Sequence, residues 1–174
     1  NNIAITVEKD KKKTIKSDGK NYKRISEHVG NYPCVMISPT DVHGLLDASE
    51  ERRKFIDQSI TQYDKDYLRQ LLEYNKLLKQ RNALLKQFAE QKSYNKLLIN
   101  TISEKMERPA QKIHEARKTF VDRISSQFSA TYKHISEDKE QARIEYKSSL
   151  HDTPFLQSLS ESNNRDRILQ RTTK

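Results

Sequence analysis

Residues 64–91 read DKDYLRQLLEYNKLLKQRNALLKQFAEQ, and apolar side chains recur in them at every third or fourth position. The recurring positions are Leu71, Tyr74, Leu78, Leu85 and Phe88, with Leu77 and Leu84 beside them. This spacing puts apolar side chains along one side of an α-helix, where a second helix can cover them. The stretch therefore predicts a long amphipathic helix over about 64–91, roughly 40 Å in length.

A second apolar pattern follows the break at residues 91–95. Its members are Leu98, Ile99, Ile102, Met106, Ile113, Ala116, Phe120, Ile124, Phe128, Tyr132 and Ile135. Pro109 lies within this pattern and must either kink the helix or begin a new one, because proline removes a backbone hydrogen bond. The two patterns together predict an antiparallel helical hairpin that protrudes as an arm.

Arg81 interrupts the apolar side of the first helix. A buried arginine needs an ionic or hydrogen-bonding partner, because a lone charge is costly to remove from water. We expect Arg81 to pair with a carboxylate or a backbone carbonyl of the return helix.

The chain before the arm has the pattern of strands. Alternating apolar residues at 3, 5 and 7, followed by residues 14–16, predict a hairpin, and Asp18-Gly19 marks a further turn. A short helix is expected near residues 22–29, ended by Gly30. The continuous apolar run at 33–38 predicts a buried strand that includes Cys34 as a small core residue.

Two helix starts come next along the chain. Ser38 can cap a helix over about 39–46, with Asp41 near its positive end, and Ser49 can cap another. Arg52 and Arg53 fall in the first turn of that second helix, where they oppose the helix dipole. They are expected to pair with an acidic partner, which could be Glu50, Asp57 or a group on another domain.

The end of the sequence predicts one strand and one helix. Residues 142–147 alternate as a strand does. Asp152 or Thr153 could cap a last helix that begins at Pro154, since proline is favoured at the first helical position.

Composition limits the function classes. Of the 174 residues, 33% are hydrophobic and 33% are charged, so a thick core is not expected. A single cysteine excludes an internal disulfide framework, and no stretch has the roughly 20 apolar residues of a membrane span. We expect a cytoplasmic protein without a membrane partner. Because both termini stop abruptly, we also expect an internal piece of a longer protein.

The formal charge of +9 is concentrated in the middle of the chain. Such a charge can attract phosphate-bearing partners, although a solvated helix surface rich in lysine explains it equally well. The five histidines have no metal-ligand spacing, so no metal site is predicted. We expect no catalytic residue in this segment.

Three ordered blocks of sequence resemble the RecF family of bacterial repair proteins. The blocks are Ser38-Pro39-Thr40-Asp41 after the apolar run, RRKFID at 52–57, and YNKLLKQRNALLK at 74–86, whose LLKQRNALLK part is the most specific. Asp166 followed by Thr172-Thr173 is similar to the approach to a later family motif.

The resemblance implies an α+β fold that is mainly α. The fold would be a small β portion of an ABC/SMC-like ATPase head plus a long antiparallel helical-hairpin arm. It implies a partial head lobe at 1–48, the helical arm at 49–140, and a strand and helix returning to the head at 141–174.

The resemblance also implies function for the full-length parent. Members bind ATP and Mg, form an ATP-dependent homodimer, bind DNA, and work with RecO and RecR to help load RecA at gapped DNA. This chain lacks a GxxxxGK[ST] loop, so no nucleotide is expected to bind the fragment itself.

Two groups of site residues follow from these observations. Ser38, Asp41, Arg52, Arg53 and Asp57 form a candidate interaction site at the corner of the head. Lys76, Lys79, Arg81 and Lys86 are candidate contacts for DNA or for a partner protein. The alternative is a purely structural coiled-coil spacer or adaptor whose basic charge is incidental.

Overall fold

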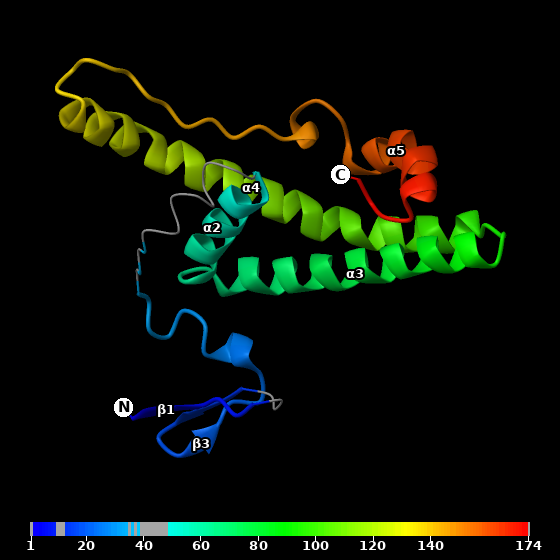
Figure 1. Ribbon diagram of the computed structural model, residues 1–174, viewed down its shortest axis with the longest axis horizontal. Coiled ribbons are helices and arrows are strands. Elements are labelled where there is room, and N and C mark those ends of the chain that lie inside the picture. The colour runs from blue at the N-terminus through cyan, green and yellow to red at the C-terminus, as the bar shows by residue number, and fades with distance from the viewer. Residues whose placement is uncertain (1, 10–12, 35, 37, 39–48, 174) are drawn as a thin grey trace. The chain divides into compact units, whose positions relative to one another are not determined.

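The structure is a computed structural model that describes residues 2–9, 13–34, 36, 38 and 49–173. It is mainly helical with one small sheet, as predicted (Figure 1). The helix expected at 39–46 lies outside the described residues. The buried strand expected at 33–38 is wrong at its described positions, because residues 33, 34, 36 and 38 belong to no strand and the first three of them are exposed. Positions 35 and 37 lie outside the described residues. The chain divides into two compact units, Asn1–Leu68 and Arg69–Lys174.

The first unit begins with a three-stranded antiparallel sheet in the order β1-β2-β3. The strands are β1 (Ile3–Thr6), β2 (Thr14–Ser17) and β3 (Lys20–Asn21). The turn between β2 and β3 is formed by Asp18 and Gly19, whose φ angles are 47° and 80°. Two successive positive φ values match the twist of a hairpin, and Asp and Gly tolerate them best. The predicted hairpin is present as the pairing of β1 with β2, and the further turn predicted at Asp18-Gly19 joins β2 to β3.

Gly30, in the segment that follows the sheet, has a backbone conformation and a close backbone contact that disfavour any residue with a Cβ atom. The helix expected near 22–29 is only the 3-10 turn η1 (Ile25–Glu27), and Gly30 follows it with a φ of 81°. A Cβ atom at Gly30 would lie 2.7 Å from the carbonyl oxygen of Gln62. The Gln62 side chain in turn accepts a hydrogen bond of 2.9 Å from the backbone N–H of Cys34.

The expectation that Cys34 belongs to a core is wrong. Its side chain is exposed. The contact that holds this residue is the hydrogen bond of its backbone N–H to Gln62. The apolar residues next to Cys34 in the sequence therefore did not predict the exposure of its thiol correctly.

Two helices follow in the chain, α2 (Ser49–Thr61) and α3 (Lys65–Glu90). Asp64 caps α3, because its Oδ1 accepts a hydrogen bond of 2.8 Å from the N–H of Tyr67. The boundaries of α3 agree with the helix predicted over about 64–91.

The second unit is built on α3 and α4 (Lys96–Ile135), which run side by side in opposite directions (Figure 1). Asn95 caps α4 by accepting a 3.0 Å hydrogen bond from the N–H of Leu98. Pro109 is buried inside α4, and the helix continues through it as a single element of 40 residues. The predicted hairpin is confirmed, and the proline does not begin a new helix.

The core of the second unit joins three helices. One cluster consists of Leu77 on α3, Met106 and Ala110 on α4, and Phe155 and Leu159 on α5 (Phe155–Leu169). A second cluster near the α3–α4 turn consists of Leu85, Phe88 and Ile99. The last helix therefore covers the hairpin and closes its apolar side.

The strand expected at 142–147 does not form. Within the described chain, residues 140–148 belong to no helix and pair with no strand, and their side chains alternate between half-buried and exposed. Their carbonyls accept from helix side chains instead: Ser125 Oγ donates to the Ile144 oxygen at 3.3 Å, and Ser129 Oγ to the Ala142 oxygen at 2.9 Å. Alternation here reflects packing on a helix.

The last helix also begins differently from the prediction. The 3-10 turn η2 (Ser149–His151) precedes it, and Pro154 occupies its N-cap position without a side-chain hydrogen bond. Neither Asp152 nor Thr153 is the cap.

Among the described residues, no helix combines the length and apolar composition needed to cross a membrane.

Candidate functional site

A buried ion pair joins α3 to α5 in the second unit. Arg81 and Asp166 are 1% and 0% exposed, and Arg81 Nη1 donates to Asp166 Oδ2 at 2.7 Å. Arg81 Nε also donates to Ser103 Oγ on α4 at 3.3 Å. A buried pair of charges is tolerated best when further hydrogen bonds use its remaining donors and acceptors, and Ser103 supplies one of them here.

The same ion pair holds the chain after α5. Arg81 Nη1 donates to Thr172 Oγ1 at 2.6 Å. The second carboxylate oxygen of Asp166 accepts from the N–H and the hydroxyl of Thr173, at 2.9 and 2.8 Å. Asn82 Oδ1 accepts from the N–H and the hydroxyl of Thr172, at 2.8 and 2.7 Å. Residues 172–173 are thus fixed to α3 and α5 by five hydrogen bonds.

The prediction for Arg81 was correct in one respect and wrong in another. Arg81 pairs with a carboxylate, but that carboxylate belongs to α5 and not to the return helix, which supplies the Ser103 hydroxyl. Because Arg81 is buried, it cannot act as a surface contact for DNA, and it does not belong with the three lysines predicted beside it. The pattern Asp166…Thr172-Thr173 was the available signal for the network, although spacing alone does not reveal its partner.

The other three members of that group lie on the surface. Lys76, Lys79 and Lys86 are all exposed on α3. They are three and seven residues apart, so they share one side of the helix, opposite the side that carries Leu77 and Leu85. No ion pair joins any of the three lysines to a carboxylate of the described chain.

The head-corner group is only partly described. Ser38 is half-buried, and Asp41 lies outside the described residues. Arg52 and Arg53 are exposed on α2. Asp57, on the same helix, accepts a hydrogen bond from the hydroxyl of Tyr67 on α3. The structure therefore uses Asp57 to join α2 to the start of α3.

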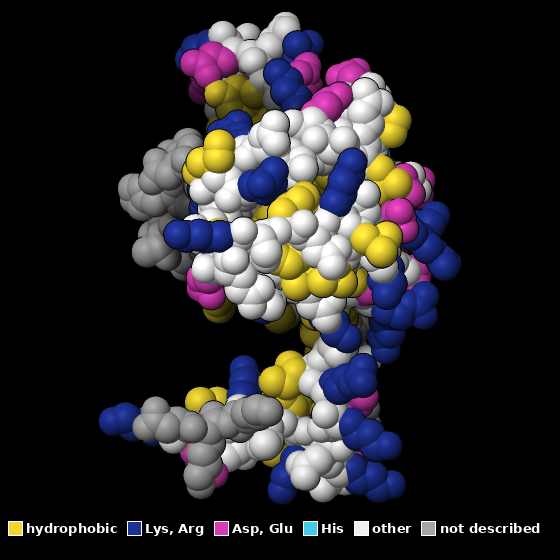
Figure 2. Space-filling view, turned by 90° about the vertical axis from the view of Figure 1, so that its right-hand side faces the viewer, with side chains coloured by type: hydrophobic (Ala, Val, Ile, Leu, Met, Phe, Trp, Pro, Cys, Tyr) yellow, Lys and Arg dark blue, Asp and Glu magenta, His cyan; other side chains and the backbone are white. Residues whose placement is uncertain are grey.

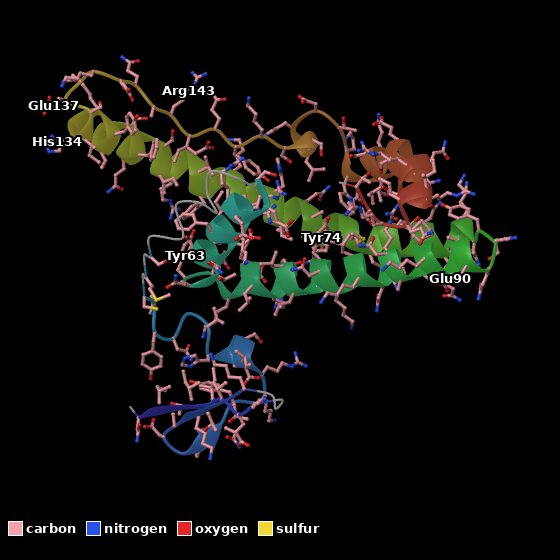
Figure 3. The ribbon with its side chains drawn as sticks, viewed as in Figure 1. Tyr63, Tyr74, Glu90, His134, Glu137 and Arg143 are labelled. Atoms are coloured by element: carbon pink, nitrogen blue, oxygen red, sulfur yellow. The ribbon has the colours of Figure 1, made fainter. Side chains whose placement is uncertain are left out.

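Tyr74 and His114 are two side chains of the second unit whose pKa values are shifted mainly by burial. Burial raises the pKa of Tyr74, which is labelled in Figure 3, and the positive charges of Arg117 and Arg81 oppose the increase. Burial lowers the pKa of His114, and the neighbouring His151 lowers it further. The rings of His114 and His151 are 4.9 Å apart. Both shifts favour the neutral forms.

The residues present do not fit a nucleotide and magnesium site. The sequence has no phosphate-binding glycine loop, whose backbone N–H groups would converge on phosphates. In the described part of the chain, no three His, Cys, Asp or Glu side chains gather in a group that could hold a metal ion.

Curated proteins of similar sequence point to one family. The chain is 36% identical to the DNA replication and repair protein RecF of Flavobacterium johnsoniae over 171 residues, which are 98% of this chain and 48% of the relative. It is 40% identical to the protein of that name from Bacteroides fragilis over 158 residues, or 91% of this chain and 42% of the relative. No family model matches the chain.

Solved structures agree with the sequence relatives. The recombination mediator protein RecF with ATP, in the RecFOR pathway, superimposes with a TM-score of 0.85 at 25% identity, over 98% of this chain and 48% of that protein. A second RecF structure, named RecF-ATPrS, gives a TM-score of 0.82 at 25% identity.

The fold is thus that of part of an ABC/SMC-like ATPase, mainly helical and with a small three-stranded sheet. The chain spans about half the length of the curated relatives that it matches. It belongs to the RecF family of DNA replication and repair proteins.

Proposed function

We propose that this chain is the arm-bearing segment of a protein that acts in DNA replication and recombinational repair. By analogy with its relatives, the parent protein binds ATP and DNA in the RecFOR pathway, and with RecO and RecR it aids the loading of RecA at gapped DNA. The segment supplies a helical surface that contacts DNA. The name shared by the relatives and the RecFOR context of the solved structures support the pathway.

The exposed lysine side of α3 carries the proposal for the segment itself. Lys76, Lys79 and Lys86 lie on one side of one helix, and no described carboxylate pairs with them. Two lysines on α4 are neutralised locally: Lys112 pairs with Glu115 at 3.2 Å, and Lys118 pairs with Asp122 on the next turn. A row of uncompensated cations is suited to a phosphate backbone.

Salt-dependent DNA binding tests this role. The chain should bind duplex DNA with little sequence preference, and the affinity should fall as salt rises, because released counterions drive the association. Changing Lys76, Lys79 and Lys86 to Glu should lower the slope of log affinity against log salt by about 2.7, from three phosphate contacts at about 0.9 each.

A variant with the same net charge controls for nonspecific attraction. Changing Lys105, Lys112 and Lys118 on α4 to Glu alters the total charge equally but leaves the proposed surface intact. We expect that variant to keep most of the slope. If both variants lose it equally, the attraction comes from total charge, and the arm is then a structural spacer.

The spacer is the second candidate function. The buried seam and the Arg81–Asp166 pair already account for the apolar and charged positions inside the hairpin. A chain that binds no DNA at low salt would favour this alternative.

A further inference from the structure

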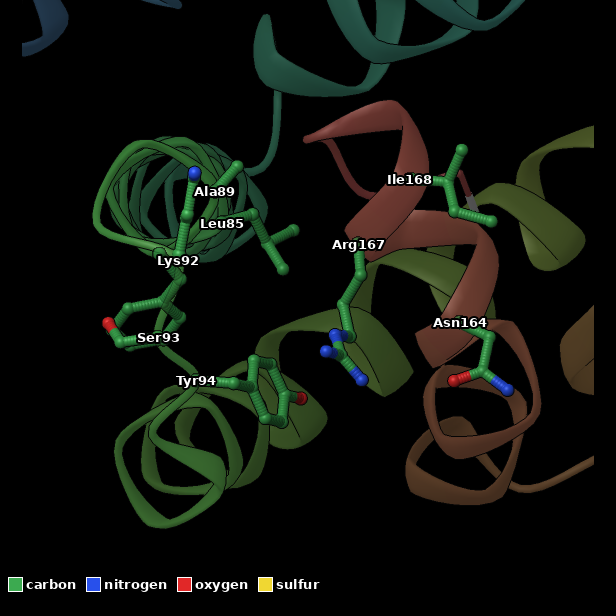
Figure 4. A pocket seen from close by; sticks show the side chains of 9 residues that line it. Leu85, Ala89, Lys92, Ser93, Tyr94, Asn164, Arg167 and Ile168 are labelled. Carbon is green, nitrogen blue, oxygen red and sulfur yellow. The ribbon is translucent and has the colours of Figure 1, made fainter.

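A pocket lies at the tip of the hairpin, where α3, the α3–α4 turn and α5 meet. Its volume is about 670 Å³, which is within the range of about 300–1,000 Å³ for ligand pockets. Its walls include Leu85, Phe88, Lys92, Tyr94, Arg167 and Ile168. Figure 4 shows residues of α3 and α5 on its two sides, with Tyr94 at the turn.

Two cations border this largely apolar pocket. Arg167 extends from α5 toward Tyr94, and its guanidinium lies 4.3 Å from the centre of the Tyr94 ring. Lys92 lies on the other side, at the turn (Figure 4). Neither side chain forms an ion pair with a carboxylate of the described chain, and no Asp or Glu lines the pocket. The site is therefore suited to a negatively charged ligand that also has an apolar part.

Exposed apolar side chains also occur in the segments that supply the walls of the pocket. Ile168 and Leu169 are 80% and 44% exposed, and Leu97 at the start of α4 is 78% exposed. Figure 2 shows this end of the hairpin, with hydrophobic side chains on the face and Lys and Arg among them. An apolar patch with a basic border is typical of a protein interaction site.

The backbone at Lys92 is an independent sign that its side chain matters. Lys92 follows α3 in the left-handed conformation, with a φ of 48°. The N–H of Lys92 donates to the Ala89 carbonyl at 3.3 Å, and that of Ser93 donates to the Phe88 carbonyl at 3.0 Å. This is the position of a helix end where glycine is strongly preferred, because a Cβ atom is disfavoured there. A lysine at this position costs stability and supplies a cation to the pocket.

The aromatic geometry favours a protein ligand over a nucleic acid. One face of Tyr94 is covered by Arg167, and the Phe88 ring packs against Tyr94 edge-on, with centroids 5.7 Å apart. The Tyr94 hydroxyl donates to Asn163 at 2.8 Å, which fixes the ring. Single-stranded nucleic acids bind by stacking their bases on open aromatic faces. Arg167 already occupies one face of the Tyr94 ring, so no base can stack on that face.

We propose that the tip pocket docks an acidic protein segment that carries one aromatic or large aliphatic anchor. The anchor enters between Leu85 and Ile168, and the carboxylates of the segment meet Lys92 and Arg167. Charge-assisted contacts in a partly desolvated site supply the preference for acidic neighbours. The proposal does not depend on DNA binding by α3, since Lys76, Lys79 and Lys86 do not line the pocket.

Fluorescence anisotropy with a labelled synthetic peptide tests the proposal. The probe has a phenylalanine after a run of aspartates, and two matched peptides replace either the phenylalanine with serine or the aspartates with asparagine. We expect saturable binding of the first peptide to the 174-residue chain, and weaker binding of each matched peptide.

Two glycine variants separate binding from folding. Lys92→Gly should raise the melting temperature or leave it unchanged, and weaken peptide binding about five- to tenfold through loss of one charge-assisted contact. Gln170→Gly is the matched control: Gln170 ends α5 with a φ of 53° but does not line the pocket. It should have the same thermal effect and leave peptide affinity unchanged.

Three results would overturn the proposal. The first is that all three peptides bind equally or none binds. The second is that Lys92→Gly and Gln170→Gly change peptide affinity to the same extent. The third is that a single-stranded oligonucleotide binds and loses affinity in Lys92→Gly while the acidic peptide does not, which would assign the pocket to nucleic acid.

Discussion

Replacing Asp166 with alanine should destabilise the second unit more than any surface substitution of an aspartate. The change leaves the Arg81 guanidinium buried, 1% exposed, without its carboxylate, and it also removes the acceptor of two Thr173 hydrogen bonds. Removing one partner of a buried ion pair costs about 3–5 kcal/mol. For a chain of this size each kcal/mol corresponds to about 2–4 °C in the melting temperature, so we expect a decrease of about 6–20 °C.

Urea and thermal unfolding followed by far-UV circular dichroism measure this loss. Asp152→Ala is the matched control, because Asp152 is exposed and surface changes are usually within about 0.5 kcal/mol. Equal losses in the two variants would show that the ion pair does not hold α5 to the hairpin. Other contacts would then have to offset the free energy that is lost when the two charges are removed from water.

Substitutions of Arg81 separate charge from volume. Arg81→Leu should be tolerated better than Arg81→Ala, because leucine fills more of the buried space, while the buried Asp166 carboxylate loses its partner equally in both variants. The double variant Arg81→Leu with Asp166→Leu should regain part of the stability lost in Asp166→Ala. If Arg81→Leu melted at a lower temperature than Arg81→Ala, the Arg81 site would not be the water-free environment that this argument requires.

Three other outcomes follow from the described geometry. Gly30→Ala should destabilise the first unit by more than about 1 kcal/mol in urea melts, because the new Cβ atom would lie 2.7 Å from the Gln62 carbonyl oxygen. Gly19→Ala should cost less, because Gly19 has a similar φ but open space around it. The lowered pKa of His114 means that the unfolded chain binds its proton more readily, so stability should be full above a pH of about 6.5 and decline as the pH falls toward the folded pKa. His114→Gln should reduce that pH dependence, and an unchanged profile would assign it to other groups. Calorimetry with Mg-ATP at physiological salt should show no saturable heat, because screened lysines do not replace converging backbone donors; micromolar binding would mean that a nucleotide site has been missed.

Local periodicity was sufficient to predict the hairpin. The apolar positions of α3 and α4 repeat within each helix, and the break at 91–95 falls where the chain turns. The caps at Asp64 and Asn95 are local as well, since each accepts a bond from a residue three positions later. The two long helices were therefore predicted closely, whereas the caps at Asp64 and Asn95 were not predicted, although each depends only on neighbours along the chain.

Features that depend on distant contacts were not predictable in the same way. Alternation at 142–147 was interpreted as a strand, but a helix surface with Ser125 and Ser129 produces the same alternation. The carboxylate that pairs with Arg81 is 85 residues later in the chain, and no spacing rule identifies it. The tip pocket also escaped prediction, although a lysine directly after a helix, where glycine is preferred, was a visible signal.

The geometry of α3 keeps its three proposed roles separate. Its buried side carries Arg81 and the leucines that hold α4 and α5, and its exposed side carries Lys76, Lys79 and Lys86. Its end leads directly to Lys92 in the tip pocket. Because residues on opposite sides of one helix share no partners, substitutions on them should be nearly additive. A lysine-to-glutamate change on the exposed side can therefore alter DNA binding without loosening the network at residues 172–173, and a change at Lys92 can alter peptide binding without either effect.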